Sequence, residues 1–141
     1  MYILDTDHVG ILQLAAGREY LALSRRIARC SQTDLYVTIV SLHEQFLGWN
    51  VYIARAKDQA ATVRGYRRME KILGDFSNAQ VLPFDEAAGE QFDDFRRQHI
   101  RIGTMDLRIA AIAHVRSMTV LTRNTVDFER VPGLSVEDWT A

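Results

Sequence analysis

Acidic and amide side chains stand just after several predicted strands, or at the start of the helix that follows. These residues are Asp5, Glu44, Asp106, and the pair Asn124 and Asp127. In an open parallel sheet, ligands bind in the crevice outside the carboxyl ends of the strands. We therefore expect these residues, which are far apart in the sequence, to come together at one edge of a sheet.

Carboxylates gathered at one place need a counter-charge. Two of them about 4 Å apart repel each other by roughly 4 kcal/mol at an effective dielectric constant of about 20. A divalent cation would relieve this repulsion, and oxygen ligands select Mg²⁺ or Mn²⁺ over zinc. Such ions generate hydroxide and stabilise charge on a phosphoryl group. The residues thus indicate metal-dependent cleavage of a phosphodiester or phosphoester, and their spacing does not separate a nuclease from a phosphatase.

Each of these residues also has a purely structural interpretation. Asp5 is placed to initiate the helix after its strand, with Thr6 or Asp7 as its cap. Ser41 and Glu44 match a capping box. Asp106 stands in a first helical turn, where a carboxylate interacts favourably with the helix dipole. A carboxylate in such a turn can also bind metal, so the two interpretations are compatible. Helix starts do not require all these positions to share one sheet edge, and the set therefore favours a functional site.

Strand and helix patterns alternate along the chain. Runs of β-branched and aromatic residues predict strands at 2–4, 35–40, 80–82, 119–122 and 134–136. Helical periodicity predicts helices at 6–14, 19–30, 41–57, 58–76, 86–99 and 104–116. This alternation predicts an α/β fold, namely a three-layer α/β/α sandwich with a central parallel sheet. The chain has 141 residues and no evident linker, so we expect residues 1–141 to form a single domain.

The composition argues against several other classes of protein. The net charge of −1 gives no overall attraction to a polyanion, so nucleic-acid binding would need a local patch. The single Cys30 excludes an internal disulfide framework and a multi-cysteine zinc site. Glycine-rich nucleotide-binding motifs, a G-x-S-x-G elbow and an H-E-x-x-H motif are absent. The sequence shows neither signal-peptide features nor an apolar run near the ~18 residues of a membrane span, so we expect a cytoplasmic protein without a membrane partner.

The helix predicted at 58–76 has two distinct faces. Four apolar residues form one stripe: Tyr66, Met69, Leu73 and Phe76. Four basic residues form the opposite face: Arg64, Arg67, Arg68 and Lys71. This basic stripe either holds phosphate groups or is a solvated helix face, and the sequence leaves both interpretations open.

Four segments in order carry the most specific pattern in the sequence. They are Met1–Asp7, Ser41–Gly48, Ile102–Ala111 and Leu121–Phe128, and the tail to Trp139 continues the pattern. Together they resemble the PIN-domain ribonucleases, specifically the VapC-type toxins of bacterial toxin–antitoxin pairs. The resemblance runs nearly end to end. It implies a PIN-like fold and a Mg²⁺-dependent endoribonuclease, with Mn²⁺ as a substitute ion.

The resemblance also implies roles for individual residues. Asp5 and Asp106 would bind the metal directly, Glu44 would support the site, and Thr6 would orient groups near it. We thus expect a catalytic set that includes Asp5, Glu44 and Asp106.

The fourth position of this set is either Asn124 or Asp127. Some relatives have an acid where this chain has Asn124. An amide can coordinate a cation, but it carries no negative charge to balance the charge of that cation. We therefore expect Asp127 to complete the catalytic set. Thr122 and Asn124, together with Thr6, are expected to contact or position the substrate.

The resemblance further implies a homodimer, an RNA substrate and a small antitoxin of VapB type. The helices between Ser41 and Phe76 are the expected docking surface for that antitoxin. Two alternatives stay open. One is a metal-dependent DNA or flap nuclease, and the other is a non-catalytic PIN-like RNA-binding regulatory module, which would have lost the acids that this chain keeps.

Overall fold

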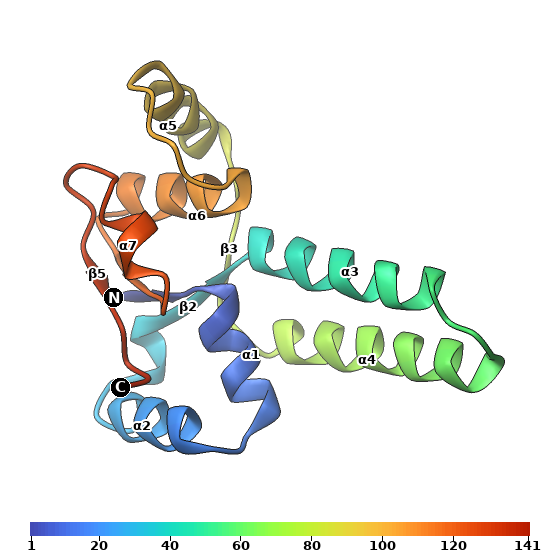
Figure 1. Ribbon diagram of the computed structural model, residues 1–141. Coiled ribbons are helices and arrows are strands. Elements are labelled where there is room, and N and C mark those ends of the chain that lie inside the picture. The colour runs from blue at the N-terminus through green and yellow to red at the C-terminus, as the bar shows by residue number, and fades with distance from the viewer.

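The computed structural model describes residues 1–141 and contains one five-stranded parallel sheet in the order β3-β2-β1-β4-β5 (Figure 1). The strands are β1 (Tyr2–Leu4), β2 (Leu35–Thr38), β3 (Val81–Leu82), β4 (Thr119–Leu121) and β5 (Val136–Glu137). The helices are α1 (Thr6–Leu14), α2 (Arg18–Ile27), α3 (Ile39–Ala54), α4 (Gln59–Ser77), α5 (Glu86–Arg97), α6 (Thr104–Val115) and α7 (Thr125–Phe128). A 3₁₀ turn, Gln32–Asp34, precedes β2. The predicted α/β class and parallel sheet are confirmed.

Alternating side chains of the strands bury against different helices, which makes the three layers. Ile3 and Val120 pack with residues of α5, α6 and α7 in one core. Leu4 and Leu121, each one position further along its strand, pack with residues of α1, α2 and α4 in the other. Successive residues of a strand point to opposite faces of a sheet. Both faces are therefore covered, as a parallel sheet requires.

The sheet order places the start of the chain at its centre. Strand β1 pairs with β2 on one side and with β4 on the other, all in parallel. The connection from β3 to β4 passes from one side of β1 to the other. This reversal makes the carboxyl ends of β1 and β4 the switch point of the sheet, outside which open α/β sheets bind ligands.

The end of β2 differs from the prediction. The sequence favoured a strand through Val40, but the helix already begins at Ile39. The reason is Thr38, whose hydroxyl accepts the backbone N–H of Ser41 at 3.2 Å and so caps α3. The β-branched residues Ile39 and Val40 follow this cap and form the first turn of the helix.

Helices α3 and α4 form an antiparallel hairpin that extends away from the sheet (Figure 1). The apolar stripe of α4 is only partly buried: Tyr66 and Leu73 are 55% and 56% exposed. The buried residues of α4 are Gly65, Ile72 and Phe76. Because the hairpin packs against the sheet only near its base, part of its apolar surface stays exposed.

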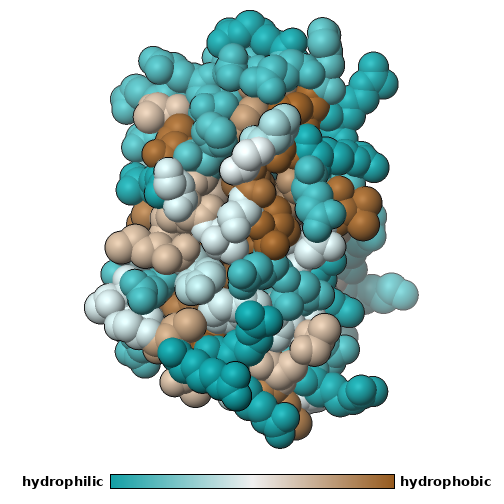
Figure 2. Space-filling view, turned by 90° about the vertical axis from the view of Figure 1, so that its left-hand side faces the viewer, coloured by the Kyte–Doolittle hydropathy of each residue, from teal (hydrophilic) through white to brown (hydrophobic).

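The C-terminus lies beside α2, on the left-hand side of Figure 1, which faces the viewer in Figure 2. There hydrophobic atoms gather at mid-height, and hydrophilic atoms cover the top and bottom (Figure 2). Helix α7 lies on this side and was not predicted, because its four residues are too few to show a helical period. None of the helices combines the length and the apolar character that crossing a membrane requires.

The close approach of α3 and α4 gives a test of the packing. A Cβ atom at Gly65 would lie 2.4 Å from Cγ1 of Ile53, whereas a Cβ at Gly74 would meet nothing within 4 Å. We expect Gly65→Ala to lower the free energy of unfolding by about 1–3 kcal/mol through overpacking. Gly74→Ala, in the same helix, should raise it by about 0.5–1 kcal/mol. Urea denaturation measures both, and equal stability of the two variants would contradict this packing.

Candidate functional site

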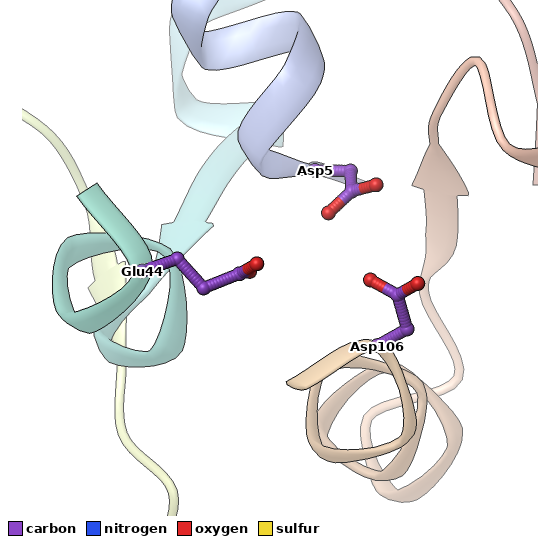
Figure 3. A group of neighbouring side chains, drawn as sticks. All are labelled: Asp5, Glu44 and Asp106. Carbon is purple, nitrogen blue, oxygen red and sulfur yellow. The ribbon is translucent and has the colours of Figure 1, made fainter. Parts of the chain in front are cut away.

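Three carboxylates from separate parts of the chain converge outside the carboxyl end of β1 (Figure 3). They are Asp5 after β1, Glu44 on α3 and Asp106 on α6, and one oxygen of each lies within 4.8 Å of the others. All three side chains point into the same space. The prediction that these acids converge at one sheet edge is therefore confirmed by the geometry.

Asp5 is the most deeply buried acid of the cluster, with 5% of its surface exposed. Its Oδ1 accepts the backbone N–H of Thr6 at 2.7 Å, so Asp5 is the cap of α1, in place of Thr6 or Asp7. Its Oδ2 accepts the hydroxyl of Thr122 at 2.7 Å. Burial raises the pKa of Asp5 from 3.8 to about 7, and the nearby charges of Asp7 and Asp106 raise it as well.

Glu44 is oriented by a residue of α1. Thr6 Oγ1 donates to Glu44 Oε1 at 2.8 Å and also lies 3.0 Å from Ser41 Oγ. The capping box proposed for Ser41 and Glu44 is wrong, because α3 is capped earlier in the chain, by Thr38. Glu44 thus stands in the second turn of the helix, free of any capping role, and faces the other two acids.

Asp106 lies in the first turn of α6, where the sequence predicted it. Its Oδ2 accepts the side-chain amide of Asn124 at 3.3 Å. Partial burial raises the pKa of Asp106, the charge of Glu44 raises it further, and the amide of Asn124 acts in the opposite direction. The cluster therefore contains two carboxyl groups that are harder to ionise than usual.

The fourth position is shared between two residues. The amide nitrogen of Asn124 lies 3.3 Å from Asp106 and 3.0 Å from Asp127, so it bridges the two acids. Asp127 lies on the outer side of this bridge, with Arg130 at 3.5 Å. The direct contact with the cluster is thus made by the amide. Whether Asp127 acts in catalysis stays a prediction.

Thr122 was expected to contact or position the substrate. Its side chain is fully buried, and its hydroxyl donates to Asp5 and accepts the backbone N–H of Asn124 at 3.0 Å. In the structure Thr122 therefore positions Asp5 and the turn after β4. The remaining substrate candidates, Thr6 and Asn124, are only partly buried.

The sequence did not single out Asp7 and His8 as parts of the site. Asp7 Oδ2 accepts the backbone N–H of Arg123 at 2.9 Å and lies 3.3 Å from Thr122 Oγ1. Burial tends to raise the pKa of Asp7, but hydrogen bonds from His8 and Arg123 outweigh it and hold the pKa below its usual value. The only signal was local: Asp7 follows Asp5 by two residues, and His8 stands directly before the apolar residue Val9.

The donor set fits a divalent cation. Three carboxylates offer oxygen ligands within 4.8 Å of one another, the kind of donor that Mg²⁺ and Mn²⁺ prefer. Burial and the negative charges of neighbouring acids raise the pKa of Asp5 and of Asp106, so a positive charge near them would stabilise their ionised forms. The chemistry expected from the sequence is thus compatible with the geometry.

The raised pKa of Asp5 predicts a pH-dependent effect of Asp5→Asn. Between pH 3.8 and about 7 the unfolded state loses the proton of Asp5 before the folded state does, so the stability that this group contributes falls as the pH rises. An asparagine at position 5 has no such proton, so the variant does not lose this stability as the pH rises. In EDTA, we expect Asp5→Asn to melt at least about 3 °C higher than the unmodified protein at pH 8, and to lose that advantage near pH 4. An advantage that is the same at both pH values would contradict the raised pKa.

Comparisons with known proteins agree with this geometry. The PIN domain family matches residues 3–134. The tRNA(fMet)-specific endonuclease VapC of Shigella flexneri is 38% identical over 78 residues, which cover 52% of this chain and 59% of that protein. Ribonuclease VapC of Rickettsia bellii is 33% identical over 105 residues, 72% of this chain and 73% of that protein. The crystal structure of FitAcB from Neisseria gonorrhoeae has a TM-score of 0.71 at 26% identity and covers 98% of this chain and 97% of that one.

The extent of these matches differs. The alignment with the Shigella flexneri protein spans less than two thirds of that relative. The family match, in contrast, includes all the elements that carry Asp5, Glu44 and Asp106. The likeness to FitAcB also extends over the whole fold. The chain belongs to the PIN domain family, together with its VapC relatives.

Proposed function

We propose that this protein is a Mg²⁺-dependent endoribonuclease, with Mn²⁺ as a substitute ion, and that residues 1–141 act as one nuclease domain. We further propose that it is the toxin of a toxin–antitoxin pair. The observation that carries the proposal is the convergence of Asp5, Glu44 and Asp106 within 4.8 Å. Membership of the PIN domain family and relatives named as VapC ribonucleases support it.

In this proposal Asp5 and Asp106 hold the cation. A bound divalent cation supplies positive charge that activates water and offsets the charge that develops on a phosphoryl group. Glu44 Oε1 is engaged by Thr6, which leaves Oε2 to accept a hydrogen bond from the attacking water and orient it. The amide of Asn124 positions the substrate and Asp106, and the buried hydroxyl of Thr122 keeps Asp5 in place.

RNA is the favoured substrate over DNA because the matched relatives are named as an endonuclease specific for tRNA(fMet) and as a ribonuclease. The acids alone would equally serve a DNA or flap nuclease. A non-catalytic regulatory module is disfavoured, because all three acids of the cluster are present and converge. A substrate of this kind is consistent with action in the cytoplasm, which we also propose.

The proposed protein partners are a small VapB-type antitoxin and a second copy of this chain. The exposed apolar surface of the α3–α4 hairpin supports a docking role, and it includes Leu47, Val51, Val63, Tyr66 and Leu73. The basic stripe lies on the same hairpin. Three of its members already contact neighbours: Arg64 donates to Tyr52, Arg68 lies over the ring of Trp49, and Lys71 pairs with Asp75. Phosphate binding and a solvated face both stay predictions for this stripe.

A cleavage assay tests the proposed activity. Purified protein incubated with total RNA should cleave it in Mg²⁺ and not in EDTA. We expect Asp106→Asn to lower the rate at least about 100-fold, because losing a metal ligand should cost no less than losing a residue that supports one. Asp93→Asn, an exposed acid on α5, is the matched control and should cleave normally. Equal cleavage with EDTA, or by Asp106→Asn, would contradict the proposal.

A second test concerns the fourth position. If Asp127 contributes charge to the site, Asp127→Asn should lower the cleavage rate by about an order of magnitude and raise the Mg²⁺ concentration needed for half-maximal activity. Asn124→Ala should then lower the rate with an unchanged metal requirement. Titration of Mg²⁺ against activity compares the two variants. The reverse pattern would assign the metal-linked role to Asn124, whose amide contacts Asp106 directly.

A further inference from the structure

His8 is a completely buried polar residue that the proposed chemistry does not use. Its Nε2 accepts the backbone N–H of Trp139 at 3.3 Å, and its Nδ1 lies 2.8 Å from Asp7 Oδ1. A backbone N–H can only donate, so Nε2 carries no proton in this arrangement. The proton of the neutral ring is therefore on Nδ1, which donates to Asp7. Asp138, 3.8 Å from Nε2, is the other charged group beside the ring.

Asp7 connects His8 to the turn after β4. The carboxylate oxygen that faces away from His8 accepts the N–H of Arg123 at 2.9 Å and lies 3.3 Å from Thr122 Oγ1. That hydroxyl donates to Asp5 at 2.7 Å. Hydrogen bonds thus link His8 to Asp7 and Asp7 to the backbone of Arg123, which directly follows Thr122, the residue whose hydroxyl holds Asp5.

The segment around Trp139, whose backbone N–H donates to His8, is firmly anchored. The side chain of Trp139 is buried, with its ring 4.7 Å from that of Tyr2 and with Arg26 stacked over it at 4.8 Å. Its indole N–H donates to Glu137 at 2.6 Å. The carbonyl of Glu137 in turn accepts the N–H of Thr122 at 2.9 Å. The backbone N–H that fixes His8 therefore belongs to a segment that cannot shift freely.

We propose that His8 is a positioning residue for cation binding, which holds Asp7 and, through Thr122, sets the place of Asp5 at the metal site. The proposal rests on the proposed function, in which Asp5 binds the cation. A buried group with a fixed tautomer, tied to an anchored backbone segment, is suited to orient a ligand through intermediate groups.

Two isosteric substitutions separate this role from a packing role. The amide of Asn occupies the place of Nδ1, so His8→Asn can still donate to Asp7 but leaves the Trp139 N–H without an acceptor. The amide of Gln occupies the place of Nε2, so His8→Gln can accept from Trp139 but does not reach Asp7. The measurement is Mn²⁺ affinity of the protein alone, by calorimetry, together with the melting temperature in EDTA.

We expect His8→Gln to weaken Mn²⁺ binding by about 10- to 100-fold, the usual effect of losing a group that supports a metal ligand. His8→Asn should bind Mn²⁺ within about threefold of the unmodified protein and melt at a lower temperature, because a buried N–H has lost its partner. Asp7→Ala should weaken binding as His8→Gln does, and the double variant should bind no worse than Asp7→Ala, since the two act in series.

Several results would overturn the proposal. They are unchanged Mn²⁺ affinity in folded His8→Gln, equal losses in the Gln and Asn variants, and additive losses in the double variant. If His8→Gln does not fold, Asp7→Ala decides, because its side chain is 32% exposed and unchanged affinity in that variant would exclude the role. A different result would indicate that the proposed function is wrong: the unmodified protein would bind no Mn²⁺, or Asp5→Asn would bind it equally well.

Discussion

The concentration of negative charge at the carboxyl end of β1 is the constraint on which the rest of the site depends. Asp5, Asp7, Glu44 and Asp106 lie in one partly buried region, where burial and neighbouring negative charges raise the pKa of Asp5 and of Asp106. Each is held by at least one donor in a fixed position: a backbone N–H, a threonine hydroxyl, an imidazole or an amide. These donors fix the position of each carboxylate within the fold.

The sheet topology supplies most of these donors. Since β1 lies between β2 and β4, the residues that follow it face the segments after both neighbours. The backbone N–H of Asp5 donates to the carbonyl of Leu121 at 2.9 Å, which fastens the end of β1 to the end of β4. Thr122, the next residue, then has its hydroxyl within reach of Asp5. Strands of only three residues suffice, because their task is to deliver the side chains that follow them.

The parts of this structure that could be predicted from sequence are those specified locally. The acids after β1 and at the start of α6 were located correctly, because strand ends and helix starts leave short-range patterns. The boundary between β2 and α3 was predicted wrongly. The hydroxyl of Thr38 caps the helix there, although the β-branched residues on either side favour a strand. The apolar stripe of α4 does not by itself tell which of its residues are buried, since burial depends on where the hairpin meets the sheet. The contact between His8 and Trp139 joins residues 131 positions apart, and no local pattern reveals it.

The amide at position 124 is understandable from the charges around it. A fourth acid in direct contact with Asp106 would add to the repulsion that already raises the pKa of that group. Asn124 instead donates to both Asp106 and Asp127, so one neutral group connects two carboxylates that would otherwise repel each other. Asp127 is also offset from outside by Arg130 at 3.5 Å. The negative charge is thus greatest at Asp5, Glu44 and Asp106 and is reduced toward the rim, which leaves the strongest attraction for a cation at the point where these three acids converge.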